Sequence, residues 1–237
     1  MLLLYRQCGH RTMPRTIYQL KPAFQNLLRP ATRALRNFGI TANHVTVSAA
    51  VLSLATGCVL IANVSRASVL LVLPPVLFLR MALNAIDGML AKEFDMKSRL
   101  GAILNELGDV ISDTALYLPL ALGWGFSASL TVLVVVMAVM TEMAGVLGVM
   151  IGATRHYDGP MGKSDRAFVI GAAALALGLG VPTGIWQDIL LAAMLPVEHS
   201  ANRAAAEMLA RVQLVRRRFL WFMRFLLWAS GRECRVR

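Results

Sequence analysis

The sequence predicts an all-α integral membrane protein with about six transmembrane helices, preceded by an amphipathic helix on the membrane surface. The chain has 237 residues, 57% of them hydrophobic, and its mean hydropathy is +0.61. Apolar runs of roughly 18 or more residues recur, long enough to cross about 30 Å of hydrocarbon as helices. Because they lack the alternation of period 2 found in barrel strands, helices are indicated. We expect one membrane domain over residues 43–200, between a tail with the surface helix (1–42) and a basic C-terminal segment (201–237).

The charge balance indicates contact with a membrane rather than with nucleic acid. The formal net charge is +11. In a membrane protein such an excess marks cytoplasmic ends and contact with anionic lipid, so no nucleic acid partner is expected. The three cysteines, Cys8, Cys58 and Cys234, are scattered. They indicate neither a disulfide framework nor a zinc site.

Residues 16–42 predict the surface helix. Its apolar side chains fall near one helical stripe, and its basic side chains lie largely beside that stripe, as in helices that lie in the membrane interface. Gly39 is expected to end the helix. A solvated basic tail is the alternative. The stripe consists of Leu27, Leu28, Ala31, Leu35 and Phe38, and the basic residues are Lys21, Arg29, Arg33 and Arg36.

Five apolar segments predict membrane spans, at about residues 45–63, 68–91, 101–123, 130–151 and 167–186. Asn43 or Thr46 is the expected N-cap of the first. Beyond these the pattern weakens, and either 185–195 or 219–229 is a candidate sixth helix.

The orientation follows from the basic residues in the short connections. The N-terminal segment and the loops at 92–100 and 152–166 are basic, whereas the turns at 64–67 and 123–129 share one basic residue. The N-terminus and both basic loops are therefore expected in the cytoplasm, in a bacterial-type inner membrane. The arginine-rich C-terminus is expected there too, which requires an even number of spans.

A polar stretch between Asn84 and Asp113 is the candidate site. A carboxylate at membrane depth costs several kcal/mol unless it is paired, so ionisable clusters there indicate function. On one predicted helix, polar and small residues share a face; on the next, they recur every four residues. A short loop would bring the two stripes together at the cytoplasmic boundary. The first stripe is Asn84, Asp87, Gly88 and Ala91, and the second is Gly101, Asn105, Asp109 and Asp113, with Glu106 slightly to the side.

Two interpretations of this stretch follow from the residues alone. Converging oxygen ligands at a phosphate-sized gap suit Mg²⁺ or Mn²⁺, and a cation would relieve the repulsion between the carboxylates. The alternative is an ion-paired structural cluster, with Arg80 and Lys92 as the partners of the acids.

The spacing resembles that of the CDP-alcohol phosphatidyltransferases. Their signature is D-x2-D-G-x2-A-R-x8-G-x3-D-x3-D, and residues 84–109 read N-x2-D-G-x2-A-K-x8-G-x3-N-x3-D with every spacing kept. The surface helix, the six expected spans and the G-I-T-A-N-H-V-T entry to the first span are also similar. Three positions depart from the signature, where Asn84, Asn105 and Lys92 stand for Asp, Asp and Arg.

The resemblance implies transfer of a phosphatidyl or similar group from a CDP-alcohol, most simply CDP-diacylglycerol, to an acceptor alcohol, with release of CMP. By position, Asp87 is implied as a metal ligand, and Asp109 as both a ligand and the base that deprotonates the acceptor. The positions of Asn84 and Asn105 are metal positions, and Glu106 and Asp113 are candidates to restore the lost charge. A homodimer is one implied assembly. The implied substrate-binding residues are Gly88, Ala91, Lys92, Gly101, Lys163 and Arg166.

The departures leave other functions open. Asn offers a neutral oxygen, so two negative charges are removed from the metal cage, and Lys92 lacks the bidentate fork of Arg. One alternative is therefore a relative that binds nucleotide or lipid without turnover. Another is a small cation-coupled transporter that uses Asp87, Asp109 and Glu142. Glu142 itself is expected either to pair with a neighbouring helix or to line the cavity.

Overall fold

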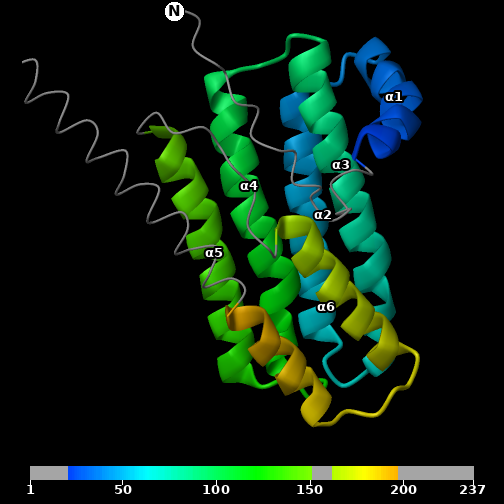
Figure 1. Ribbon diagram of the computed structural model, residues 1–237. Coiled ribbons are helices and arrows are strands. Elements are labelled where there is room, and N and C mark those ends of the chain that lie inside the picture. The colour runs from blue at the N-terminus through cyan, green and yellow to red at the C-terminus, as the bar shows by residue number, and fades with distance from the viewer. Residues whose placement is uncertain (1–20, 151–161, 197–237) are drawn as a thin grey trace, which may run out of the picture.

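A computed structural model describes residues 21–150 and 162–196, which form a bundle of helices (Figure 1). In the described residues α3 and α4 are consecutive, and each packs against α2. A short helix, Ile185–Pro196, follows the last labelled element. The elements in order are α1 (Lys21–Asn37), α2 (Ala42–Ala62), η2 (Ala67–Val72), α3 (Leu73–Glu93), α4 (Arg99–Tyr117), η3 (Leu118–Leu122), α5 (Ala128–Met150) and α6 (Lys163–Gly178).

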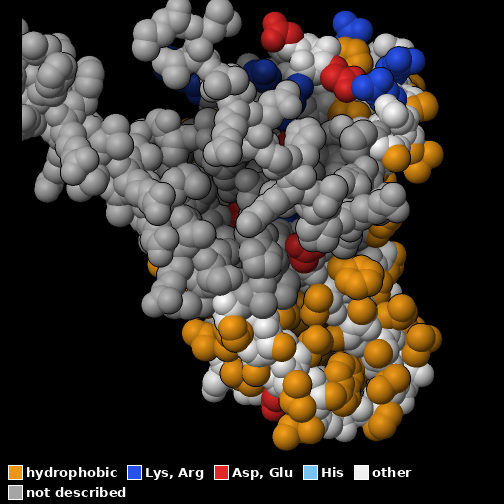
Figure 2. Space-filling view, viewed as in Figure 1, with side chains coloured by type: hydrophobic (Ala, Val, Ile, Leu, Met, Phe, Trp, Pro, Cys, Tyr) orange, Lys and Arg blue, Asp and Glu red, His pale blue; other side chains and the backbone are white. Residues whose placement is uncertain are grey.

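Three of the expected spans are confirmed as helices long and apolar enough to cross a membrane. They are α2, the continuous η2–α3 segment Ala67–Glu93, and Ala128–Leu147 of α5. Figure 2 shows hydrophobic side chains over much of the visible lower surface, whereas Lys and Arg gather at the end that carries α1. Large exposed side chains such as Phe78, Leu133 and Met140 point away from the bundle. A lipid environment accounts for an outer surface with so many exposed hydrophobic side chains.

The other predicted spans differ from the structure. The expected third span is helical as α4 and η3, but the charged side chains of α4 keep it outside the apolar class. The expected fifth span at 167–186 is wrong in its boundaries, because α6 starts at Lys163 and ends at Gly178, where the chain turns through Gly180 at φ +96°. Six spans are therefore not shown in the described residues.

The structure explains in part why the candidate sixth span at 185–195 has a weak apolar pattern. Ile185–Pro196 is a helix of about 18 Å by its length, shorter than a bilayer core. Two of its polar side chains form hydrogen bonds with the backbone of the turn before α5. Asp188 accepts from Ser127 N at 2.9 Å, and buried Gln187 donates to Trp124 O at 3.2 Å. The alternative segment at 219–229 lies outside the described residues.

A helix is confirmed over the described part of 16–42, as α1, and its place on the membrane surface stays a prediction. It ends as expected at Gly39, whose φ of +74° is the left-handed conformation that glycine adopts without strain. Ile40 N donates to Leu35 O across this turn at 3.0 Å. The N-cap of α2 is Thr41, not Asn43 or Thr46. Thr41 was missed because its partner is His44, which replaces the usual Glu of a capping box and accepts from Thr41 N.

Close packing of α2 against α4 brings the polar faces of the bundle together. A Cβ atom added at Gly57 of α2 would overlap the backbone carbonyl oxygen of Ala115 on α4. Gly108 of α4 similarly faces the methyl group of Thr46, at 3.5 Å from the Cβ position. Glycine at position 57 therefore sets the distance between these two helices.

We expect Gly57→Ala to lower the thermal stability of the purified protein, because the helices must separate or shift, at a cost of about 1–3 kcal/mol. The matched control is Gly145→Ala, where the added Cβ meets nothing within 4 Å. That change should be neutral or slightly stabilising, since alanine is the better helix former by about 1 kcal/mol. Equal melting temperatures for the two variants would contradict this account of the packing.

Candidate functional site

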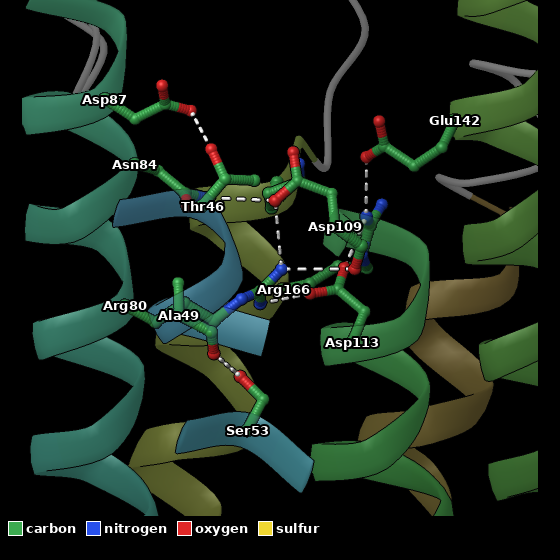
Figure 3. A network of polar contacts seen from close by, with 11 residues as sticks. Thr46, Ala49, Ser53, Arg80, Asn84, Asp87, Asp109, Asp113, Glu142 and Arg166 are labelled. Carbon is green, nitrogen blue, oxygen red and sulfur yellow. Dashed lines mark hydrogen bonds and ion pairs between the residues drawn. The ribbon is translucent and has the colours of Figure 1, made fainter. Parts of the chain in front are cut away.

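The polar stripes of α3 and α4 meet as the spacing predicts. The short connection 94–98 joins the helices, and Ser98 caps α4 by accepting a hydrogen bond from Gly101 N at 2.8 Å. Asn84 Nδ2 of α3 donates to Asp109 Oδ1 of α4 at 3.0 Å. Figure 3 shows these side chains pointing toward one another across the space between the helices.

Asp87 is held by a residue of a third helix. Its Oδ2 lies 2.9 Å from the hydroxyl of Thr46 on α2, and both side chains are buried. Thr46 was missed as a site residue because its sequence position indicated only a helix cap. The placement at 8% exposure leaves Asp87 facing the bundle interior rather than lipid.

Asp109 is engaged on both carboxylate oxygens. Oδ1 accepts from Asn84 and, at 3.3 Å, from Arg80 Nη2, while Oδ2 forms an ion pair with the ammonium of Lys163. Lys163 is the first residue of α6, which is aligned by a hydrogen bond from Gly162 N to the Asp165 carboxylate at 2.9 Å. α6 therefore delivers a positive side chain to Asp109 from a helix 54 residues further along the chain.

A second, deeper layer consists of ion pairs among four helices (Figure 3). Asp113 of α4 pairs through Oδ1 with Arg80 of α3 and through Oδ2 with Arg166 of α6, the latter at 3.2 Å. Arg166 also pairs with Glu142 of α5 at 3.1 Å. Arg166 is 1% exposed. These contacts give structural partners to Asp113 and Arg166 and place Glu142 in a pair with a neighbouring helix.

The remaining predicted residues lie around this pair of layers. Asn105 and Glu106 are half-buried on α4, and Lys92 is exposed at the end of α3. A Cβ at Gly88 would meet nothing within 4 Å, so the described residues leave room for a side chain at that position. A Cβ at Gly101 would approach Asn43 Oδ1 to 2.6 Å, so glycine is needed there for the close approach of α2. Ala91 packs in the smaller apolar cluster with Ile86 and Leu90.

The donor set has the chemistry for one hard divalent cation. Carboxylate and amide oxygens are the ligands that Mg²⁺ and Mn²⁺ take. Among the described residues no group of three or more His, Cys, Asp or Glu is placed to hold a metal, so the amides would have to contribute. The NH₂ group of Asn84 donates to Asp109, so the amide oxygen of Asn84 is the atom that would bind a cation. The residues that would hold a cation are Asp87, Asn84 and Asn105, since both oxygens of Asp109 already have partners in the chain.

Comparison with known proteins identifies the family. The CDP-alcohol phosphatidyltransferase profile matches residues 39–199, which is more than half of the chain. The chain belongs to this family. A curated relative, the inner membrane protein YnbA of Escherichia coli (strain K12), is 45% identical over 201 residues, which cover 84% of this chain and all of YnbA.

Solved structures support the same fold for the family member described here. Phosphatidylinositol phosphate synthase PgsA1 of Mycobacterium tuberculosis, solved with CDP-DAG bound, aligns with a TM-score of 0.63 at 19% identity. The alignment covers 76% of this chain and 91% of that one. A second PgsA1 structure, in complex with manganese and citrate, gives the same TM-score and covers 87% of that chain. At this identity the likeness establishes the fold.

The deep layer generates a stability prediction. Arg166→Met should destabilise the protein by about 3–5 kcal/mol, because Asp113 and Glu142 lose a buried partner. Adding Glu142→Leu should recover part of the loss by removing one unpaired carboxylate. Arg29→Met is the control: its pair with Glu93 is 3.3 Å long but about half exposed, so its removal should cost at most about 1 kcal/mol.

Thermal unfolding in one detergent, followed by the loss of the monodisperse peak in size-exclusion chromatography, compares the four proteins. If Arg166→Met melts with the wild type, or if the double variant melts below the single one, the ion pairs do not stabilise the bundle as described.

Proposed function

We propose that this CDP-alcohol phosphatidyltransferase family member transfers a phosphatidyl group from CDP-diacylglycerol, or a related CDP-alcohol, to an acceptor alcohol. The observation that carries the proposal is the placement of Asp87 and Asp109. Both are buried, they lie on facing helices, and Asn84, one turn before Asp87 on α3, donates to Asp109. Membership in the family and the PgsA1 structure with CDP-DAG supply the class of donor.

The reaction balances without an added co-reactant. The acceptor oxygen forms a bond to the phosphorus that carries the lipid alcohol, and the bond from that phosphorus to the oxygen of CMP breaks. The hydroxyl proton goes to a carboxylate, and CMP leaves with the electron pair. A divalent cation, when bound, would neutralise the diphosphate and stabilise the leaving phosphate.

The residues of the chain have separate tasks in this scheme. Asp109 accepts the proton, the role that its position in the family signature implies, and the neighbouring Arg80 and Lys163 would orient an anionic substrate beside it. Thr46 and Asn84 fix the rotamers of Asp87 and Asp109 through their hydrogen bonds. Lys92 and Lys163 are the exposed and partly exposed cations available to phosphate oxygens, while Gly88 leaves room beside Asp87. Arg166 pairs with Asp113, one turn after Asp109 on α4, and so helps to position α4.

The direct test is CMP release from CDP-diacylglycerol by the purified protein with Mg²⁺ or Mn²⁺ and a panel of acceptor alcohols. Asp109→Asn should lower the rate by at least about 100-fold, since general-base catalysis alone contributes 10²–10⁴-fold, and Asp87→Asn should lower it by weakening the binding of the cation. Asp95→Asn is the matched control, because Asp95 lies in the exposed loop at φ +54°, which asparagine tolerates. It should leave the rate unchanged.

Two outcomes would replace the proposal. Full activity of Asp109→Asn would assign the base elsewhere. CDP binding without turnover for every acceptor would favour the non-catalytic relative, an outcome consistent with the engagement of both Asp109 oxygens by protein donors.

We also propose that the site faces the cytoplasm. Basic residues favour that side, and α1 with its arginines lies at the end of the bundle where α3 leads into α4. In a variant with the three native cysteines replaced, a cysteine at Lys97 should react with an impermeant maleimide in inverted inner-membrane vesicles and not in intact spheroplasts. A cysteine in place of Ser129, which is exposed beside the opposite turn, should show the reverse pattern and is the reference. Labelling of Lys97→Cys in spheroplasts would reverse the orientation.

A further inference from the structure

The site has a cationic side chain of its own, Lys163, on one of its two shallower carboxylates. Lys163 lies at Asp109 Oδ2, where a metal shared by this carboxylate would otherwise bind. We propose that the Lys163 ammonium takes the place of a second divalent cation, so that the substrate-free protein binds one. The inference rests on the proposed function, since that function is what calls for a divalent cation.

The first support is the coordination of Asp109. An oxygen that binds a metal offers its lone pairs to the ion, and a positive ammonium at the same oxygen competes with it electrostatically. Oδ2 carries Lys163, and Oδ1 already accepts from Asn84 and Arg80. Asp87 differs: only its Oδ2 has a hydrogen bond, from Thr46, among the described residues. One cation therefore finds a better place on Asp87 and the amide oxygens than between the two carboxylates.

The second support is the total charge. The two layers hold four carboxylates and three cationic side chains, a net charge of −1. One divalent cation changes the net charge to +1, whereas two change it to +3. Six of these seven side chains belong to buried residues, and uncompensated charge in such surroundings is expensive. The seventh is Lys163.

The third support is the position of Lys163 itself. Its side chain is 26% exposed, whereas those of Arg80 and Arg166 are 4% and 1% exposed. It is therefore the most exposed of the three cationic side chains in the two layers. The N-terminus of α6 lies at the same point and adds positive potential at Asp109. With neutral Asn84 and Asn105 in place of acids, a second divalent cation would bind weakly. The ammonium of Lys163, which is part of the chain, supplies the positive charge instead.

The test counts bound Mn²⁺ in the substrate-free, full-length protein by electron paramagnetic resonance, from the loss of the free-ion signal during titration. We expect one Mn²⁺ per wild-type chain and two for Lys163→Met. Lys163→Gln, which is also neutral but polar, should likewise bind two and serves if the Met variant does not fold. Lys97→Met removes the same charge from the exposed loop and should stay at one.

Two Mn²⁺ per wild-type chain, none, or one in both Lys163 variants would each overturn the inference. The count needs no turnover, so it is separable from the proposed function. A wild type that releases no CMP but shows one Mn²⁺, rising to two without Lys163, would refute the transferase and keep the inference. A wild type that turns over with two Mn²⁺ would do the reverse.

Discussion

The pairing of Arg80 with Asp113 is the interaction on which the rest of the site depends. It joins α3 to α4 inside a bundle whose outer surface is apolar, and Arg166 extends it to α6 and, through Glu142, to α5. Charges at this depth are tolerable only in pairs. The pairs therefore determine which faces the four helices turn inward. Asn84 and Asp109 lie one turn nearer the 94–98 connection on the same faces, so the pairs also position them.

This arrangement divides one polar stripe into two functions. Asp113 and Asp109 stand four residues apart on α4, yet Asp113 is enclosed by two arginines whereas Asp109 meets one arginine, an amide and a partly exposed lysine. The deeper carboxylate is held by two buried arginines, whereas one partner of the shallower carboxylate, Lys163, is partly exposed. The ion-paired interpretation therefore holds for Arg80 with Asp113 and Asp109, whereas the metal site stays a prediction.

The sequence predicts the local part of this site well. Helical periodicity places Asn84 and Asp87 on one face and Asp109 and Asp113 on the next, and a short loop makes the helices neighbours, as the Asn84–Asp109 hydrogen bond confirms. It does not predict contacts between distant elements. Lys163 and Arg166 lie one turn apart on α6, and they pair with Asp109 and Asp113, which lie one turn apart on α4. The sequence did not predict these pairs because α6 was expected to begin at 167. Thr46 and Glu142 likewise became interpretable only when α2 and α5 were placed.

The departures from the family signature form a consistent set when charge is considered. Asn84 replaces an acid but donates to Asp109 through its NH₂ group, which a carboxylate cannot do. Lys163 then meets an Asp109 that has one fewer negative neighbour on α3. An acid at position 84 would face Asp109 without a donor between them, and like charges at that distance require a cation to hold them together. Amide and ammonium therefore perform locally what a second metal ion would perform, which makes the family fold compatible with this altered set of residues.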